Sequence, residues 1–345
     1  MLLAIAALGS GASWLDIQIS RPYRGHRPEK VFVDIPHGTP RWEVAHILKR
    51  NDVIRNPLAF ALFSEWHFRR PLQAGEYLFD QSLNSREVFW KISHGRIFVQ
   101  TVTVPEGFTM YDIADELDRE GVCNREDFLA AAHDTKLISD LDPHAASLEG
   151  FLFPSTYFFT RHTTCEQVAR RMVQNFRVAW NMAQAATSGT ATPGALTPAE
   201  TVTLASLVER ETPKAEERPL VAGVFSNRLK KGYALQCDPT VQYASALAGH
   251  PVKDVRPADL RIDSPYNTYL HRGLPPGPIA NPGEASLRAA LAPTATDDLY
   301  FVADDAGGHL FSRTLEEHNR NVARLRSLLA RDAASSDTPP KKATQ

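Results

Sequence analysis

The sequence predicts an α+β fold in which two small strand–helix units precede a larger mixed α/β domain. Two patterns support this: a repeated strand–turn–helix motif over residues 30–126, and helical periodicity interleaved with short strands over residues 127–330. At 345 residues, the chain is long enough for two or three domains. Residues 1–19 and 331–345 follow neither pattern.

An internal repeat underlies the first pattern. The segment VDIPHGTPRWEVAHILKRNDV, which begins at Val33, matches VTVPEGFTMYDIADELDREGV, which begins at Val102, at a constant offset of 69 residues. Each copy has a short strand, a Pro-x-Gly turn and an amphipathic helix whose apolar residues recur every three or four positions. The repeat therefore predicts two copies of one unit, either purely structural or able to bind a ligand.

The two ends of the chain are predicted to lie outside these domains. The segment MLLAIAALGSGA at the N-terminus is apolar but too short to span a bilayer alone, and no Lys or Arg precedes it. We interpret residues 1–19 as part of a truncated membrane anchor; a cleaved leader and a short buried segment are the alternatives. Residues 331–345 have no apolar periodicity and are predicted to be disordered.

Charge and cysteine content exclude several functional classes. The formal net charge is −2 and there is no long basic run, so nucleic acid is not a predicted partner. Cys123, Cys165 and Cys237 lie far apart, and no His/Cys cluster has metal-ligand spacing. We therefore expect no disulfide framework, no metal and no cofactor.

The segment LEGFLFPSTY, residues 148–157, places one carboxylate, Glu149, at the edge of an apolar and aromatic run. Apolar surroundings remove hydration and penalise the charged form, so the pKa of Glu149 should rise towards neutral pH. A carboxyl group that is protonated at neutral pH can act as a general acid. The alternative is an ordinary surface glutamate.

Further candidate residues follow helix and loop signals in the second half. A capping box at Thr197 and Glu200 starts a helix that carries Glu209 near its C-terminal end, where a carboxylate is unfavourable for the helix dipole. Residues 273–283 are mostly Pro and Gly, which predicts a stiff loop of the kind that carries sites. The candidates for substrate binding are Glu209, Gln236, Asp238, Thr240, Tyr266, Asn267, Tyr269 and Asn281. Asp238 and Asn281 also precede predicted helices, so helix capping is their alternative role.

Together these motifs closely resemble those of the endolytic murein transglycosylases, the MltG or YceG-like family. The resemblance spans nearly the whole chain and rests on LEGFLFPSTY, LASLVERET, LQCDPTVQY and YNTYLHRGLPPGPIANPG. The repeated units resemble LysM modules. The resemblance implies tandem LysM-like units over residues 30–126 and a YceG-like catalytic domain over residues 127–330.

The resemblance also implies an activity and a location. Such enzymes cleave the MurNAc–GlcNAc bond within nascent peptidoglycan strands without water, leave 1,6-anhydro-MurNAc ends and so terminate glycan elongation. The catalytic glutamate of the family's LEG motif maps onto Glu149. The expected location is the bacterial inner membrane, with a single pass, a catalytic domain outside the cytoplasm, and peptidoglycan synthases (penicillin-binding proteins) as candidate partners.

Two other functions are compatible with the same residues. A non-enzymatic scaffold could use the repeats to bind peptidoglycan. A muramidase could use two carboxylates, with Glu149 as the acid and Glu209 as its partner.

Overall fold

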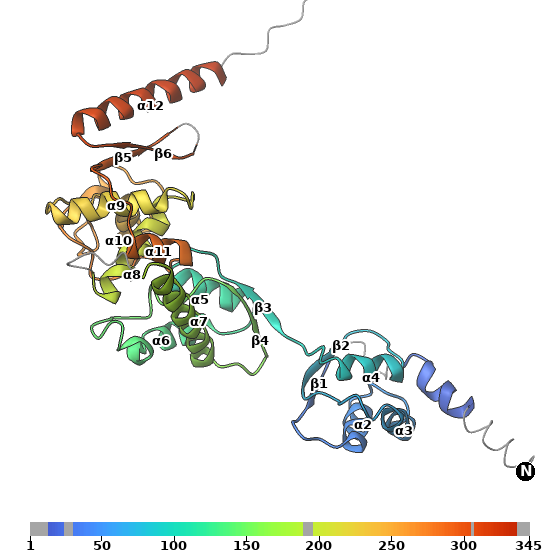
Figure 1. The fold of residues 1–345 in the computed structure, drawn as a ribbon. Helices are drawn as coiled ribbons and strands as arrows, with labels where there is room; N and C mark the ends of the chain where they lie inside the picture. The colour runs from blue at the N-terminus through green and yellow to red at the C-terminus, as the bar shows by residue number, and fades with distance from the viewer. Residues whose placement is uncertain (1–12, 24–29, 189–195, 305–306, 337–345) are drawn as a thin grey trace, which may run out of the picture. The chain divides into compact units, whose positions relative to one another are not determined.

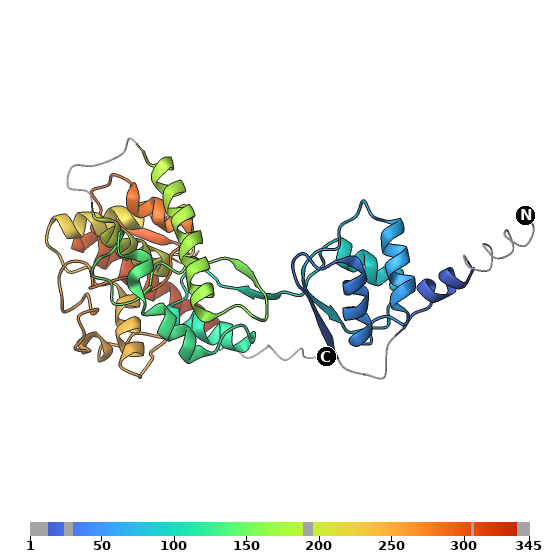
Figure 2. The ribbon, with the colours of Figure 1, turned by 90° about the horizontal axis from the view of Figure 1, so that it is seen from below.

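The structure is a computed structural model that describes residues 13–23, 30–188, 196–304 and 307–336. The chain divides into two compact units, Met1–Gln100 and Thr101–Gln345, each with its own buried core (Figures 1 and 2). The predicted mixture of helices with small sheets is confirmed. The division falls after residue 100, whereas the sequence predicted the catalytic domain to begin at residue 127.

The first unit is a strand–helix–helix–strand motif followed by a helix. Its elements are β1 (Val31–Ile35), α2 (Arg41–Arg50), α3 (Pro57–Trp66), β2 (Gly75–Phe79) and α4 (Ser85–Ser93). β1 and β2 pair antiparallel, with Val33 opposite Tyr77. Every one of these elements supplies a buried side chain to the core, namely Val33, Leu48, Phe60, Tyr77 and Phe89.

The second copy of the repeat begins the second unit with the same order of elements. These are β3 (Gln100–Thr103), α5 (Met110–Arg119), α6 (Arg125–Ala132), the 3-10 turn η1 (Thr135–Ile138) and β4 (Thr156–Phe159). β3 pairs with β4, and the Val104 N–H donates to the Ser155 carbonyl at 2.9 Å. Gly38 and Gly107, in the two Pro-x-Gly turns, have φ values of 80° and 79°, a left-handed conformation that glycine adopts without strain.

Helices make up most of the rest of the second unit. The elements are α7 (Cys165–Ala186), α8 (Pro198–Glu211), α9 (Arg218–Lys230), α10 (Asp238–Leu247), η2 (Asp259–Arg261), α11 (Glu284–Leu291), β5 (Tyr300–Ala303), β6 (His309–Ser312) and α12 (Leu315–Ser336). α11 packs against α7, α8 and α9 (Figure 1). β5 and β6 form an antiparallel hairpin. The predicted capping box at Thr197 and Glu200 is also confirmed.

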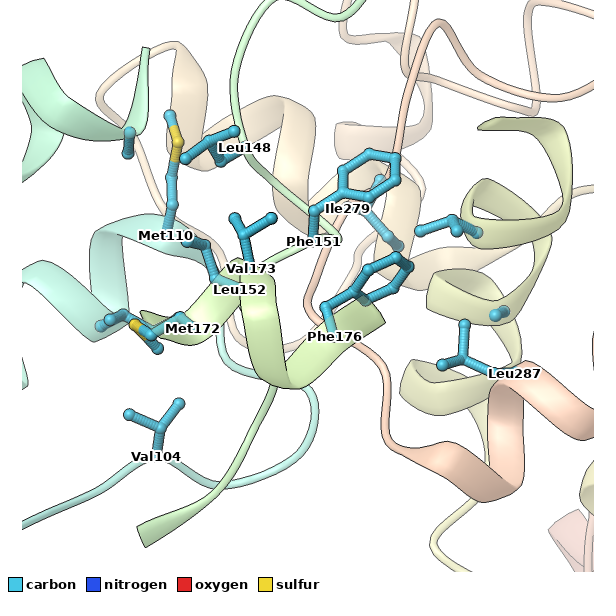
Figure 3. Packing of buried hydrophobic residues seen from close by; sticks show 14 of the residues in the cluster. Val104, Met110, Leu148, Phe151, Leu152, Met172, Val173, Phe176, Ile279 and Leu287 are labelled. Carbon is cyan, nitrogen blue, oxygen red and sulfur yellow. The ribbon is translucent and has the colours of Figure 1, made fainter. Parts of the chain in front are cut away.

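The core of the second unit surrounds the segment that carries Glu149. Leu148, Phe151 and Leu152 are each at most 1% exposed. The Phe151 ring lies edge-on to that of Phe176 on α7, with ring centroids 5.0 Å apart (Figure 3). Burying a side chain of this size stabilises a protein by about 1.5–3 kcal/mol. The flanking residues therefore hold the backbone of Glu149 in place.

The sequence predicted no disulfide framework, and in one respect this prediction was wrong. Cys123 and Cys165 form a disulfide, with Cα atoms 5.6 Å apart, although 42 residues separate them in sequence. Cys123 follows α5 and Cys165 begins α7, and the fold brings these two ends together. Cys237 is buried and free.

The two predicted terminal segments lie largely outside the described residues. Residues 1–12, most of the predicted anchor, are not described, and residues 13–20 are helical. In the part of the chain that the structure describes, no helix is both long and apolar enough to cross a membrane. At the other end, α12 continues to Ser336, so residues 331–336 of the predicted disordered tail are helical, and residues 337–345 are not described.

We predict that a chain beginning at Val99 folds without the first unit, because it retains β3, α5 and the whole second core. A chain beginning at Asp127 should not fold to a stable state, because it leaves β4 without its partner and removes eight buried residues of that core, among them Val102, Ile113 and Leu117. Thermal unfolding followed by circular dichroism would compare the two chains. A cooperative transition of similar midpoint in both would contradict this division of the chain.

Candidate active site

Glu149 lies in the loop between η1 and β4. The residues on either side of it, Leu148 and Gly150, are held by a backbone hydrogen bond and by close packing. The Leu148 N–H donates to the carbonyl of Ala132 at the end of α6, at 2.7 Å. Gly150 has a φ of +85°, and a Cβ at this position would lie 2.4 Å from Pro278 Cγ. Glycine in the LEG motif therefore allows the Pro/Gly-rich loop, residues 273–283, to pack directly against this segment.

The carboxyl group of Glu149 is held by donors from three separate segments, although the residue is only 3% exposed. The N–H of Met110, the first residue of α5, lies 3.0 Å from Oε1 and 3.1 Å from Oε2. Asn281 Nδ2 of the Pro/Gly-rich loop donates to Oε1 at 2.8 Å. The Tyr243 hydroxyl of α10 lies 3.2 Å from Oε2. A helix N-terminus, a loop and a second helix thus converge on one side chain.

Burial raises the pKa of Glu149 from 4.5 to about 8, and the nearby charge of Asp112 adds to the rise. The hydrogen bonds from Met110 and Tyr243 favour the carboxylate and oppose this effect, but desolvation outweighs them. At neutral pH the group therefore holds its proton. The Tyr243 hydroxyl, unlike an N–H group, can accept a hydrogen bond, so it can serve the protonated carboxyl as well as the ionised one.

Three tyrosines surround this carboxyl group. Burial, followed by the charge of Glu149, raises the pKa of each of Tyr111, Tyr243 and Tyr266. The rings of Tyr243 and Tyr266 lie 5.0 Å apart at 59°. The tyrosines therefore remain neutral, polar groups around the acid.

A cavity of about 480 Å³ adjoins this cluster and offers space for a ligand. Tyr243 lines the cavity and also contacts Glu149, so it joins the two. Among the other lining residues are Thr109, Tyr111, Asp112, Arg125, Arg210, Gln242, Lys253 and Ile279. The lining combines aromatic, apolar and charged side chains, as ligand sites commonly do.

Asn281 is the predicted candidate that the structure brings directly to Glu149. Its Nδ2 also donates to the Phe108 carbonyl at 2.9 Å, and its Oδ1 accepts from the Leu152 N–H at 2.9 Å. The capping role was the wrong alternative, because Gly283 occupies the cap position of α11. Asn281 instead positions the carboxyl group.

Glu209 has a different environment. Its Oε1 accepts from Arg218 at 2.7 Å and its Oε2 accepts from the Gly283 N–H at 2.9 Å, and its side chain is 3% exposed. Burial raises the pKa of Glu209, while the Gly283 N–H and Arg218 act in the opposite direction. The contacts of Glu209 are those of a buried structural ion pair that supports the Pro/Gly-rich loop.

The structure does not bring three other candidates to Glu149. Gln236, Asp238 and Tyr269 line a separate cavity of about 430 Å³, together with Glu211 and residues of β5. The Tyr269 hydroxyl donates to Asp238 Oδ1 at 2.5 Å. Asp238 is not a helix cap, because Cys237 holds that position.

Thr240 and Asn267 support the local backbone. The Thr240 hydroxyl donates to the Cys237 carbonyl at 2.6 Å, within the first turn of α10. Asn267 Nδ2 donates to the carbonyls of Leu260 and Ile262, at 3.0 and 2.9 Å, and so fixes the loop around η2.

Sequence reasoning missed Tyr243, Tyr111 and the Met110 N–H. Tyr243 ends the LQCDPTVQY segment and lies on the buried side of α10. In the sequence, the only signal of this position is the apolar periodicity of the helix. Met110 contributes a backbone group, which has no signal of its own in the sequence. The capping box of Thr109 and Asp112 marks a helix N-terminus, where N–H groups are free to bind a carboxyl group.

We predict that Glu149→Gln stabilises the folded protein at alkaline pH. Because the pKa of Glu149 is about 8 in the folded state and 4.5 for an unperturbed glutamate, the folded state binds more protons between these limits. The stability of the parent protein should therefore fall as pH rises through this window, and glutamine removes the effect. The variant should gain on the order of 1–4 kcal/mol at pH 9.

Thermal unfolding from pH 5 to pH 9 measures this difference. Glu216→Gln, which changes an exposed carboxylate, is the matched control and should follow the parent protein. A Glu149→Gln curve parallel to the parent curve at every pH would contradict the raised pKa.

Comparison with known proteins identifies the family to which this chain belongs. The profile of the YceG-like family matches residues 33–324. The chain is similar to the endolytic murein transglycosylase of Bacillus subtilis (strain 168), with 35% identity over 306 residues that cover 84% of this chain and 83% of that protein. Its similarity to the endolytic murein transglycosylase of Streptococcus pneumoniae (strain D39) is 32% over 332 residues, covering 88% of this chain and 59% of that protein.

A solved structure agrees with these matches. The crystal structure of a yceG-like protein from Listeria monocytogenes is 33% identical, with a TM-score of 0.55, and the match covers 85% of this chain and 99% of that one. Since the family profile spans most of the chain, from the first strand to the last helix, this protein belongs to the YceG-like family.

Proposed function

We propose that this protein is an endolytic lytic transglycosylase that cleaves the MurNAc–GlcNAc bond within peptidoglycan strands and leaves 1,6-anhydro-MurNAc ends. The observation that carries the proposal is the buried Glu149 carboxyl group, whose pKa is raised by burial and which Tyr243 links to a cavity of about 480 Å³. The names of two relatives support the same substrate and reaction.

One carboxyl group is enough for this reaction. Glu149 donates its proton to the glycosidic oxygen, the bond from that oxygen to C1 of the muramyl sugar breaks, and the GlcNAc hydroxyl leaves. The Glu149 carboxylate then removes the proton from the muramyl C6 hydroxyl, and O6 bonds to C1. No water is consumed, and the glutamate ends the cycle protonated, as it began.

The contacts of Glu149 suit both halves of this cycle. Burial favours the protonated acid before the first step. The donors from Met110, Asn281 and Tyr243 are already in place to stabilise the carboxylate that forms between the steps. A single group can therefore act first as the acid and then as the base.

A two-carboxylate muramidase is the less favourable alternative. Such a mechanism needs a second carboxylate that is free to activate water or attack C1. Glu209 is engaged by Arg218 and the Gly283 N–H, and Asp112 is engaged by the N–H and hydroxyl of Thr109. A pure scaffold is less favourable still, because it has no need of a buried, protonated glutamate.

The first unit and the N-terminal segment extend the proposal. We propose that the strand–helix–helix–strand motif of the first unit is LysM-like and binds glycan, and that residues 1–19 anchor the protein in the inner membrane with its domains outside the cytoplasm. The disulfide between Cys123 and Cys165 supports this location, because disulfides persist in oxidising compartments. Peptidoglycan synthases are the proposed partners at that membrane.

We predict that Glu149→Gln nearly abolishes glycan cleavage while the protein stays folded, because glutamine keeps the shape but cannot supply the proton. The expected loss is about 10²–10⁴-fold. Mass spectrometry of digested glycan strands would measure it and would identify anhydro ends in the products of the parent protein. Reducing ends in those products would instead support the muramidase.

Glu209→Gln separates the two mechanisms. It should destabilise the fold by on the order of 1–3 kcal/mol, because it leaves Arg218 buried with a weakened partner. At a temperature where the variant is folded, its products should still carry anhydro ends. A loss of activity as large as that of Glu149→Gln, in folded protein, would favour a two-carboxylate mechanism.

We predict that the chain beginning at Val99 binds murein sacculi less well than the full chain and no longer fractionates with membranes. Both losses follow if binding and anchoring depend on residues 1–98. Sedimentation with sacculi and membrane fractionation in high salt would test them. Equal binding by both chains would leave the first unit a structural role only.

A further inference from the structure

The cavity beside Glu149 carries an excess of positive charge. Arg125, Arg210 and Lys253 line it, and Asp112 is the acidic residue among its lining residues. Asp112 Oδ2 accepts both the N–H and the hydroxyl of Thr109, at 2.8 and 2.7 Å. This carboxylate is therefore committed to capping α5 and is poorly placed to neutralise a cation across the cavity.

The three cations differ in their partners. Arg125 donates to Asp115 at 2.6 Å, so its charge is already paired. Arg210 has neutral partners in the described part of the chain: the Gly107 carbonyl at 3.1 Å and Gln242 Oε1 at 3.4 Å. Within those same residues, no carboxylate lies within salt-bridge distance of the ammonium group of Lys253. Arg210 and Lys253 are therefore the cations available to a ligand.

Gln242 joins these two residues and links them to the acid. Its Oε1 accepts from Arg210, and its Nε2 donates to the Lys253 carbonyl at 2.6 Å. The next residue of α10 is Tyr243, whose hydroxyl contacts Glu149. Arg210, Lys253 and Tyr243 line the same cavity, so a ligand held by the two cations would share that cavity with the tyrosine that contacts Glu149.

We propose that Arg210 and Lys253 bind a carboxylate carried on the lactyl arm of a muramyl sugar and thereby select which sugar lies over Glu149. This inference rests on the proposed function. In peptidoglycan the muramyl sugar bears that arm and GlcNAc does not, so an anion site beside the acid distinguishes the two alternating sugars. The carboxylate is either that of the lactyl group, where the stem peptide has been removed, or one of the stem peptide.

The two cations act on the ligand and not on the acid. The influences that set the pKa of Glu149 are burial, its hydrogen bonds and Asp112. Loss of Lys253 should therefore change KM and leave the pH profile of kcat in place. Arg210 and Lys253 are both exposed, so salt should weaken their effect.

Binding to the Glu149→Gln protein, which should hold glycan without cleaving it, tests the proposal. Three probes are needed: glycan strands with stem peptides, strands stripped by an amidase that leaves the lactyl carboxylate, and strands whose carboxylates are converted to methylamides. The methylamide strands should bind about three- to tenfold more weakly than whichever unmodified strand, stem-bearing or stripped, carries the recognised carboxylate. Adding Lys253→Gln should remove most of that difference.

Lys231→Gln is the matched control, since it removes the same charge from an exposed lysine at the end of α9. Arg210→Lys, which keeps the charge, should retain more of the discrimination than Arg210→Gln. Stripped strands that bind more tightly than stem-bearing strands would assign the lactyl carboxylate, because stem-bearing strands hold that group as an amide. Stripped strands that bind as weakly as methylamides would assign the stem peptide. Equal binding of all strands to the Glu149→Gln protein would overturn the proposal. So would a loss of affinity for methylamide strands that is as large with Lys253→Gln added as without it.

Failure of the proposed function has a different signature. It would appear as an absence of anhydro ends in the products of the parent protein, whatever the binding results. Carboxylate-dependent binding with no cleavage would therefore reject the transglycosylase and keep the anion site.

Discussion

The hydrogen bonds of the Asn281 side chain hold the proposed active site together. Its amide nitrogen reaches Glu149 and the carbonyl of Phe108, and its amide oxygen accepts the Leu152 N–H. The three contacts join the Pro/Gly-rich loop, the turn before α5 and the LEG segment, which lie more than 120 residues from the loop in sequence. Without this bridge, the Glu149 carboxyl group would lose its nearest donor, and the carboxylate form would be less stabilised.

Two buried glutamates illustrate how the fold assigns different roles to one residue type. Glu209 has Arg218 within 2.7 Å, so its charge is neutralised and its function is to hold Gly283 of the Pro/Gly-rich loop. Glu149 accepts hydrogen bonds from neutral groups, the Met110 N–H, the Asn281 amide and the Tyr243 hydroxyl, and burial raises its pKa to about 8. The loop that Glu209 supports carries Asn281, and the structural glutamate thereby helps to position the proposed general acid.

The position of the second repeat has consequences for both packing and chemistry. In the first unit, the strand–helix–helix–strand motif closes on itself through β1 and β2. In the second, the return to β4 passes through the LEG segment, and the helix that follows the Pro-x-Gly turn supplies the Met110 N–H to Glu149. One copy of the repeat is thus part of the site. The division after residue 100 accordingly leaves this copy in the same unit as the core it contributes to.

The sequence by itself determined the local features of this protein. The capping box at Thr197, the glycines of the two turns, the hairpin after Leu299 and the apolar setting of Glu149 all follow from neighbours within a few residues, because caps, turns and periodicity are local properties. Only the tertiary structure decided that Asn281 and Tyr243 reach Glu149, that Asp238 and Tyr269 line another cavity, and that Cys123 meets Cys165. These contacts join residues that are 31 to 132 positions apart in sequence. Their geometry depends on how whole helices pack, which no short stretch of sequence encodes.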